Sequence, residues 1–128
     1  MFTKQITTIY PEKFIYNEDL LSTDLGRNSI TYIGAASFRS NSGLRISNIS
    51  VNNITSIDSD TFNYNKQLQS LELQSNSICD IHVTTFRFNS RLRRLDISGN
   101  NIAHIKRTDV SWNENNAPGH VAKQHKVS

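Results

Sequence analysis

The feature of this 128-residue sequence that most constrains its fold is an internal repeat of constant length. Ungapped copies begin at Leu20, Leu44, Leu68 and Leu92, and a partial copy occupies residues 1–19. Counted from its leading leucine, the repeat keeps seven positions nearly constant: Leu at 1, Leu or Ile at 6, Asn at 9 and 22, Ile at 11 and 14, and Phe at 19. Such a period predicts a solenoid, in which each copy is one coil stacked on its neighbours.

The pattern inside each copy predicts one short strand per coil. Apolar and polar residues alternate in 71–73 and 95–97, which is the period of a strand with one buried face. One copy is too small to bury its own apolar face, so stacked strands should form a parallel sheet over a continuous core. Thr23 and Ser47 replace leucine at position 4. We therefore expect looser packing in the first two coils, with a bulge at Ile46 to compensate.

The asparagines at position 9 need a separate explanation. Where a strand ends, its backbone groups lose their ladder partners, and an Asn amide can both donate to and accept from such groups. The alternative is a set of ordinary turn residues at the surface. The fixed spacing favours a ladder that bridges neighbouring coils, formed by Asn28, Asn52, Asn76 and Asn100.

These positions resemble the leucine-rich repeat, LxxLxLxxNxIxxIxxxxFxxxxx, in the 24-residue form of animal extracellular proteins such as Toll-like receptor and Slit-like ectodomains. The resemblance implies an α/β fold: a right-handed solenoid with a parallel sheet on its concave face and loops, turns or short helices on its convex face. It covers residues 1–105, as a partial coil 1–19 and coils from 20, 44, 68 and 92. Residues 106–128 form a polar tail that we expect to be partly disordered.

The resemblance also implies that the solvent-facing strand positions on the concave side carry binding. Three of the four residues at position 5 are acidic, which favours a basic partner. The alternative is a charged surface that only prevents aggregation. The predicted function is protein–protein recognition in an extracellular receptor, adhesion or immune protein; the alternatives are a carbohydrate- or lipid-binding module and a structural spacer. The candidate partner-binding residues are Asp24, Arg27, Asn48, Val51, Glu72, Gln74, Arg94 and Asp96.

Two further features bear on localisation and assembly. Asn48-Ile49-Ser50 and Asn53-Ile54-Thr55 are N-glycosylation sequons, and a glycan on Asn48 would cover the concave face of the second coil. Extracellular relatives usually carry cysteine-rich caps, whereas this sequence has a single cysteine, Cys79. We therefore expect a fragment or short member, extracellular or at the cell surface, with no signal peptide or membrane-spanning segment in this sequence. Its uncapped ends predict a homodimer.

No catalytic or cofactor-binding pattern accompanies the repeat. No histidine pairs with a cysteine at zinc spacing, and the sequence lacks a phosphate-binding loop and a nucleophile elbow. We therefore expect no enzyme activity, no cofactor and no metal. The net charge of +3 demands no nucleic-acid partner. A basic cluster before the last strand is interpreted as a solvated loop, with a heparin or phosphate site as the alternative: Arg87, Arg91, Arg93 and Arg94.

Overall fold

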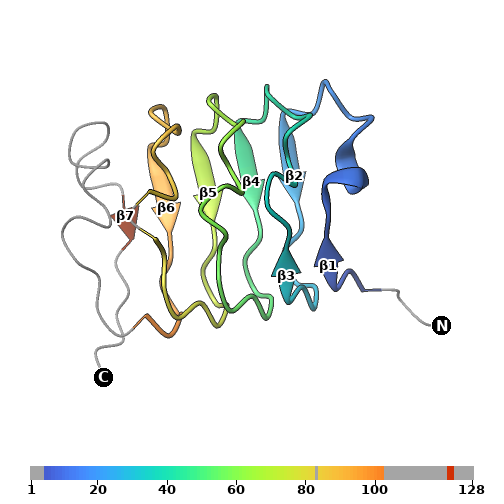
Figure 1. The fold of residues 1–128 in the computed structure, drawn as a ribbon. Coiled ribbons are helices and arrows are strands. Elements are labelled where there is room, and N and C mark those ends of the chain that lie inside the picture. The colour runs from blue at the N-terminus through green and yellow to red at the C-terminus, as the bar shows by residue number, and fades with distance from the viewer. Residues whose placement is uncertain (1–4, 83, 103–120, 123–128) are drawn as a thin grey trace.

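The structure is a computed structural model that describes residues 5–82, 84–102 and 121–122. Its strands lie side by side along one row, and the connecting segments complete one coil per repeat (Figure 1). The main sheet has five parallel strands in the order β2 (Ser22–Asp24), β4 (Ile46–Asn48), β5 (Ser70–Glu72), β6 (Arg94–Asp96) and β7 (Val121–Ala122). β5 and β6 each begin one residue earlier than the segments 71–73 and 95–97 that the alternation of apolar and polar residues indicated.

A second, smaller sheet lies elsewhere, on the partial coil 1–19 and the first full coil. It pairs β1 (Thr8–Ile9) with β3 (Tyr32–Ile33) in parallel, and the paired residues are again one repeat apart. Between these elements, the 3-10 helix η1 (Pro11–Phe14) begins at a proline, whose fixed φ suits the first turn of a helix. It is the only helix in the described part of the chain.

The register of the main sheet repeats the sequence period without a slip. Asp24 pairs with Asn48, Asn48 with Glu72, and Glu72 with Asp96. Each strand therefore turns its position-4 side chain toward the interior and its position-3 and position-5 side chains toward the outside. The sequence separation between paired residues changes at the last strand. Leu95 pairs with Val121, which lies more than one repeat length farther along the chain.

The core is built from the columns that the sequence identified. The Ile and Leu side chains at positions 1, 6, 11 and 14 are buried from Leu25 to Ile102. On the other side of each coil, the position-19 phenylalanines form a stack with ring centroids 5.6, 5.8 and 6.3 Å apart and nearly parallel planes. Rings at these separations attract each other in offset stacks, so the column adds to the burial energy. The stack consists of Phe14, Phe38, Phe62 and Phe86.

The expected bulge at Ile46 is wrong. Ile46 is 46% exposed and pairs in regular register, so it does not enter the core. Thr23 and Ser47 fill position 4 themselves: both are buried, and their hydroxyl oxygens lie 2.9 Å apart. Because each hydroxyl gives the other a hydrogen-bond partner, two buried polar residues fit where leucines stand in the later coils.

The predicted polar tail falls mostly outside the described residues, as does the domain boundary at residue 105. Within the tail, Val121–Ala122 forms β7, which extends the sheet beside β6. The repeat pattern ends after Ile105 and the step to β7 is longer than the period, so the period itself does not predict this strand.

Candidate binding face

The exposed side of the main sheet brings together most of the predicted binding residues. We call this surface the sheet face, formed by the outward side chains of β2, β4, β5 and β6. Asp24, Asn48, Glu72 and Asp96 stand in one row across it, because they are direct partners in the parallel register. The resemblance placed these residues side by side, and the structure does the same.

The acidic side chains of this row are held in place by their own neighbours. The Asp24 Oδ1 atom accepts hydrogen bonds from the Gly26 N–H at 3.1 Å and from the Asn48 amide at 3.3 Å. The Asp96 Oδ1 atom accepts from the N–H and the hydroxyl of Ser98 at 3.0 and 2.6 Å. These bonds fix the carboxylates before any partner arrives, which lowers the entropy lost on binding.

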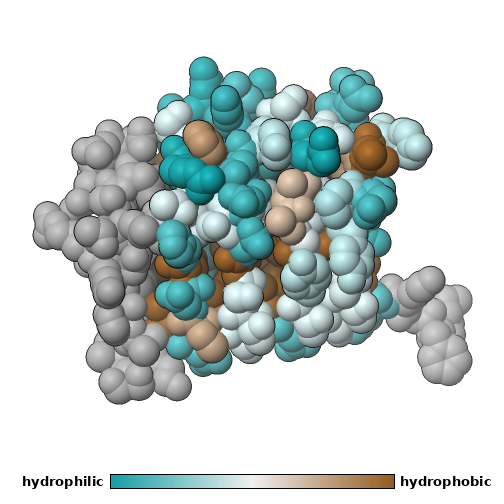
Figure 2. All heavy atoms as spheres, viewed as in Figure 1, coloured by the Kyte–Doolittle hydropathy of each residue, from teal (hydrophilic) through white to brown (hydrophobic). Residues whose placement is uncertain are grey.

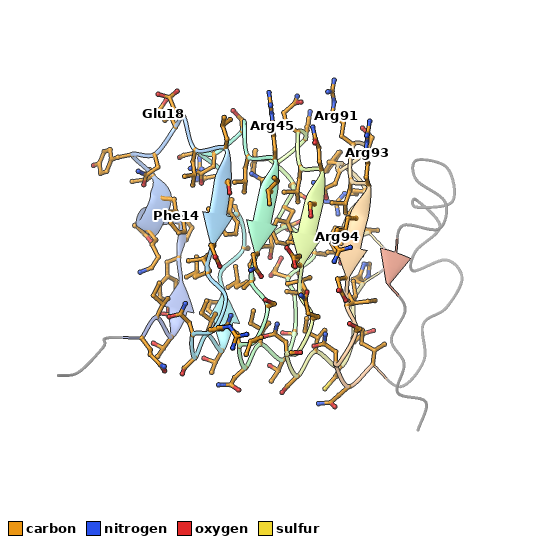
Figure 3. All side chains as sticks on the ribbon, turned by 180° about the vertical axis from the view of Figure 1, so that it is seen from behind. Phe14, Glu18, Arg45, Arg91, Arg93 and Arg94 are labelled. Carbon is orange, nitrogen blue, oxygen red and sulfur yellow. The ribbon has the colours of Figure 1, made fainter. Side chains whose placement is uncertain are left out.

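The face is less acidic than its sequence indicated. Arg94 lies beside the row on β6, with its Nη2 atom 3.6 Å from the Asp96 Oδ2 atom (Figure 3). Glu72 accepts a hydrogen bond from the Gln74 amide at 3.1 Å and forms no ion pair among the described residues. Asp24 and Glu72 therefore carry the uncompensated negative charge of the row.

Position 8 holds a backbone feature that sequence analysis missed. Arg27, Val51, Ser75 and Gly99 all have positive φ, between 55° and 67°. This left-handed conformation is routine for glycine and costly for a β-branched side chain such as that of Val51. The only signal in the sequence was Gly99 itself. The turn carries the chain from the strand to the position-9 asparagine, and it leaves the Arg27 and Val51 side chains exposed beside the sheet face.

The position-9 asparagines bridge adjacent coils. The Oδ1 atoms of Asn52, Asn76 and Asn100 accept from the backbone N–H of the preceding coil at 2.9–3.1 Å. Each Nδ2 group donates to carbonyl oxygens of its own coil and of the preceding one, as Asn76 does to Leu73 and Ile49 at 3.0 and 3.1 Å. Asn28 accepts from the Ile6 N–H at 3.2 Å and donates to the Leu25 and Gly26 carbonyls of its own coil. The amides thus form hydrogen bonds with the backbone N–H and C=O groups that lack a partner in the sheet beyond the ends of the strands.

A second asparagine ladder runs beside the phenylalanine stack, at position 22. The Nδ2 atoms of Asn41, Asn65 and Asn89 each donate to two carbonyl oxygens of the preceding coil, at 2.8–3.2 Å. All three side chains are fully buried. The constant asparagines at this position were the signal for the ladder, although sequence analysis gave them no role.

The two sequons differ in accessibility. The Asn48 amide is half-buried and engaged at both ends: Nδ2 donates to Asp24, and Oδ1 accepts from the Ser50 N–H and hydroxyl. Asn53 is exposed, and among the residues that the structure describes its backbone N–H alone is bonded, to the Ile30 carbonyl. Asn53 is therefore the more accessible acceptor for a glycan.

The basic cluster of the sequence separates into different sites. Arg87 pairs with Asp60 at 3.2 Å and covers the Phe88 ring at 4.8 Å, whereas Arg94 points onto the sheet face. Arg91 and Arg93 lie with Arg45 along the edge where the strands begin (Figure 3). Arg45 is distant in sequence, but it shares repeat position 2 with Arg93.

Other chemistry is not indicated in the described part of the chain. No group of three or more His, Cys, Asp or Glu residues there is arranged to hold a metal ion. None of the described helices has the length and apolar character needed to cross a membrane. Cys79 is exposed and free.

Comparison with known proteins agrees with this architecture. The leucine-rich-repeat family model matches residues 42–102. In the TLR13–ssRNA13 crystal structure, a chain is 27% identical with a TM-score of 0.75 over 92% of this chain. The leucine-rich-repeat domain of APL1B is 21% identical (TM-score 0.77, 84% of this chain), and a chain of the Drosophila Toll–Spatzle complex is 23% identical (0.76, 86%). No curated protein sequence matches.

The predicted leucine-rich-repeat solenoid is confirmed, and the chain is similar to leucine-rich-repeat proteins of the Toll-like type. The matches at 21% and 23% identity support the fold alone. The chain spans 16% of the TLR13 chain, 33% of the APL1B domain chain and 15% of the chain in the Toll–Spatzle complex. The similarity therefore covers only a small part of those proteins.

Proposed function

We propose that the sheet face recognises a protein, and that the chain acts in an extracellular or cell-surface receptor, adhesion or immune protein. The observation that carries this proposal is the row of fixed acceptor groups from Asp24 to Asp96. Preoriented carboxylates suit Arg, Lys and amide donors of a partner. The similarity to Toll-type proteins supports recognition as the general role, and we propose no catalytic activity.

The same row argues against two other kinds of ligand. Although the TLR13 structure is a complex with ssRNA, the exposed Asp24 and half-buried Glu72 carboxylates here would repel a phosphate backbone. A lipid-binding module needs a continuous apolar surface. The residues that pair in one row across the sheet face, Asp24, Asn48, Glu72 and Asp96, are all polar. On the face shown in Figure 2, hydrophobic residues likewise appear mainly in gaps between polar and neutral ones. The polar sheet face favours a protein partner over both.

A peptide-display selection on the immobilised chain would test this function. We expect enrichment of peptides rich in Arg and Lys, and loss of that enrichment in Asp24→Asn/Glu72→Gln/Asp96→Asn. The matched control Glu12→Gln/Asp58→Asn/Asp80→Asn removes the same charge from exposed positions away from the sheet face. Equal binding by both variants would place recognition elsewhere, and enrichment by neither the wild type nor the variants would favour a structural spacer. Retention of sugars or lipids instead would favour the carbohydrate- or lipid-binding alternative.

The extracellular assignment makes its own prediction. If the chain passes through the secretory pathway, we expect a glycan on Asn53 and little or none on Asn48, because only Asn53 presents a free, exposed amide. Peptide mapping by mass spectrometry of the secreted protein checks this. High occupancy at Asn48 would contradict the proposed use of the sheet face, since the glycan would cover its second strand. The homodimer through uncapped ends stays a prediction, because residues 1–4 and 103–120 lie outside the described part.

A further inference from the structure

The edge at which the strands begin is a second surface, separate from the sheet face. We call it the entry rim and define it as residues 18–21, 42–45, 66–69 and 90–93, the segments that lead into β2, β4, β5 and β6. Backbone hydrogen bonds hold its position-2 residues in a row: Arg45 N–H donates to Leu21, Gln69 to Arg45, and Arg93 to Gln69, at 2.7–2.8 Å. The rim is therefore a rigid part of the stack.

The charge on this rim reverses from one end to the other. Glu18 and Asp19 are exposed where the chain enters the first full coil, and Arg91 and Arg93 are exposed where it enters the last. Figure 3 shows Glu18 at one end of the edge and Arg91 and Arg93 at the other, with Arg45 between them. The only ion pairs in the described part of the chain are Arg87–Asp60 and Arg94–Asp96, so these four charges have no ionic partner there.

The acidic end of the rim is hollowed. Residues 16–20 line a shallow, open groove, and Tyr16 beside the two acidic residues is 92% exposed. A guanidinium fits such a groove, because it can form paired hydrogen bonds with a carboxylate while it stacks on an aromatic ring. The arginines at the other end of the rim are the matching groups.

We propose that the entry rim binds the entry rim of a second copy of this chain, related to the first by a two-fold axis. A two-fold contact brings each end of one rim against the opposite end of the other, so Arg91 and Arg93 of each copy reach Glu18 and Asp19 of its partner. The two ends are three coils apart in both copies, about 14 Å at the spacing of parallel strands, so both contacts can form together. In the middle of the contact Arg45 of each copy faces the segment of the other that carries the exposed Lys66, so the end contacts must outweigh this repulsion.

The reversal of charge selects this partner over a linear polyanion. A sulfated glycan could contact the row of cations Arg45, Lys66, Arg91 and Arg93, but its continuation along the rim would meet Glu18 and Asp19 and be repelled. A second copy satisfies both ends. The contact also leaves the sheet faces of both copies free, so the dimer would present two recognition surfaces. It does not depend on the proposed function of those faces.

Sedimentation velocity of the full 128-residue chain tests the proposal with charge-swap variants. We expect reversible dimerisation between about 10 and 500 µM, because a rim contact is smaller than a standard interface, and weakening at high salt. Glu18→Arg/Asp19→Arg and Arg91→Glu/Arg93→Glu should each lower the association constant at least about tenfold. The quadruple variant, and an equimolar mixture of the two double variants, should recover it to within about threefold.

The control Lys13→Glu/Arg39→Glu changes two exposed charges outside the rim and should dimerise as the wild type does. Circular dichroism melting verifies that each variant is folded. A wild type that stays monomeric over this range overturns the proposal, as does a dimer that is indifferent to the rim charges, which would point to the chain ends. Salt-sensitive retention on immobilised heparin by a chain that remains monomeric would also overturn it, in favour of a polyanion.

Discussion

The two halves of the solenoid solve the same packing problem in different ways. At position 4, β5 and β6 contribute Leu71 and Leu95, which are 0% and 1% exposed. In β2 and β4 the same position holds Thr23 and Ser47, which are almost as deeply buried and bonded to each other across the strands. The backbone register is the same in both halves.

This difference shows what the repeat requires at each position. The strand pairing and the asparagine ladders fix the coil geometry, so position 4 must only be filled and left without an unpaired polar atom. Leucine achieves this by burial alone, and it contributes hydrophobic free energy. A pair of hydroxyls achieves it by mutual bonding, which is close to neutral in net free energy. We therefore expect stability to be concentrated in the later coils.

The largest expected effect follows from truncating the leucine of β5. Leu71→Ala should lower the free energy of unfolding by about 2–5 kcal/mol, because it opens a cavity in the core between β4 and β6. Urea unfolding followed by circular dichroism measures the loss. Thr23→Ala at the same position of β2 should cost clearly less. Equal losses would mean that the halves are packed alike and that the comparison is wrong.

The asparagine ladder should show no such difference between the halves. Asn52 and Asn76 make equivalent bonds to the preceding coil, so either change to alanine should cost about 1–3 kcal/mol by leaving buried backbone groups unpaired. The same urea titrations check this, with the exposed Asn53→Ala as the matched control. If Asn76→Ala unfolded at the same urea concentration as the wild type, the ladder would not contribute to stability.

The sequence predicted most of this architecture because the period itself carries it. Constant columns identify the coil, its buried side chains and the outward row Asp24, Asn48, Glu72 and Asp96, since side-chain direction follows from register. What it could not predict depends on pairs of residues from different coils. When each copy is considered alone, Thr23 and Ser47 are polar residues at a position that should hold a buried leucine. The bulge at Ile46 was expected because their hydrogen bond across the strands cannot be seen in one copy.

The distribution of charge along the entry rim could not be predicted from the sequence for the same reason. In sequence, Arg91 and Arg93 belong to a run with Arg87 and Arg94, and Arg45 stands alone. Stacking separates the run into a convex pair with Asp60, a sheet-face pair with Asp96 and the rim. Opposite charges three coils apart become ends of one surface only once the coils are aligned in space.

A double-mutant cycle at position 4 isolates the hydroxyl pair. Ser47→Ala should cost about 1–2 kcal/mol, because the buried Thr23 hydroxyl loses its partner. Thr23→Val/Ser47→Ala removes both polar groups and should lie within about 1 kcal/mol of the wild type. Urea unfolding of the four proteins gives the coupling energy. Additive losses would contradict the bond as the reason why these residues are tolerated.

The smallest effect concerns the left-handed position 8, where the halves again differ. Val51 in the second coil has a φ of 55°, whereas Gly99 occupies the same position in the last coil with a φ of 67°. A left-handed conformation costs a non-glycine residue about 1–2 kcal/mol, and a change to glycine removes this strain. Glycine is more flexible in the unfolded chain, so the change also costs about 0.5–1 kcal/mol in backbone entropy on folding. Val51→Gly should therefore raise the free energy of unfolding by about 0.5 kcal/mol.

The reverse change provides its control. Gly99→Ala should destabilise by about 1 kcal/mol, since the new Cβ atom would also lie 3.3 Å from the Ser75 nitrogen. Thermal unfolding of both variants beside the wild type resolves the opposite signs. If Val51→Gly were destabilising, the exposed Val51 side chain would have to contribute more by contact than its backbone costs. The strain at position 8 would then be a feature that the sheet face retains for its own packing.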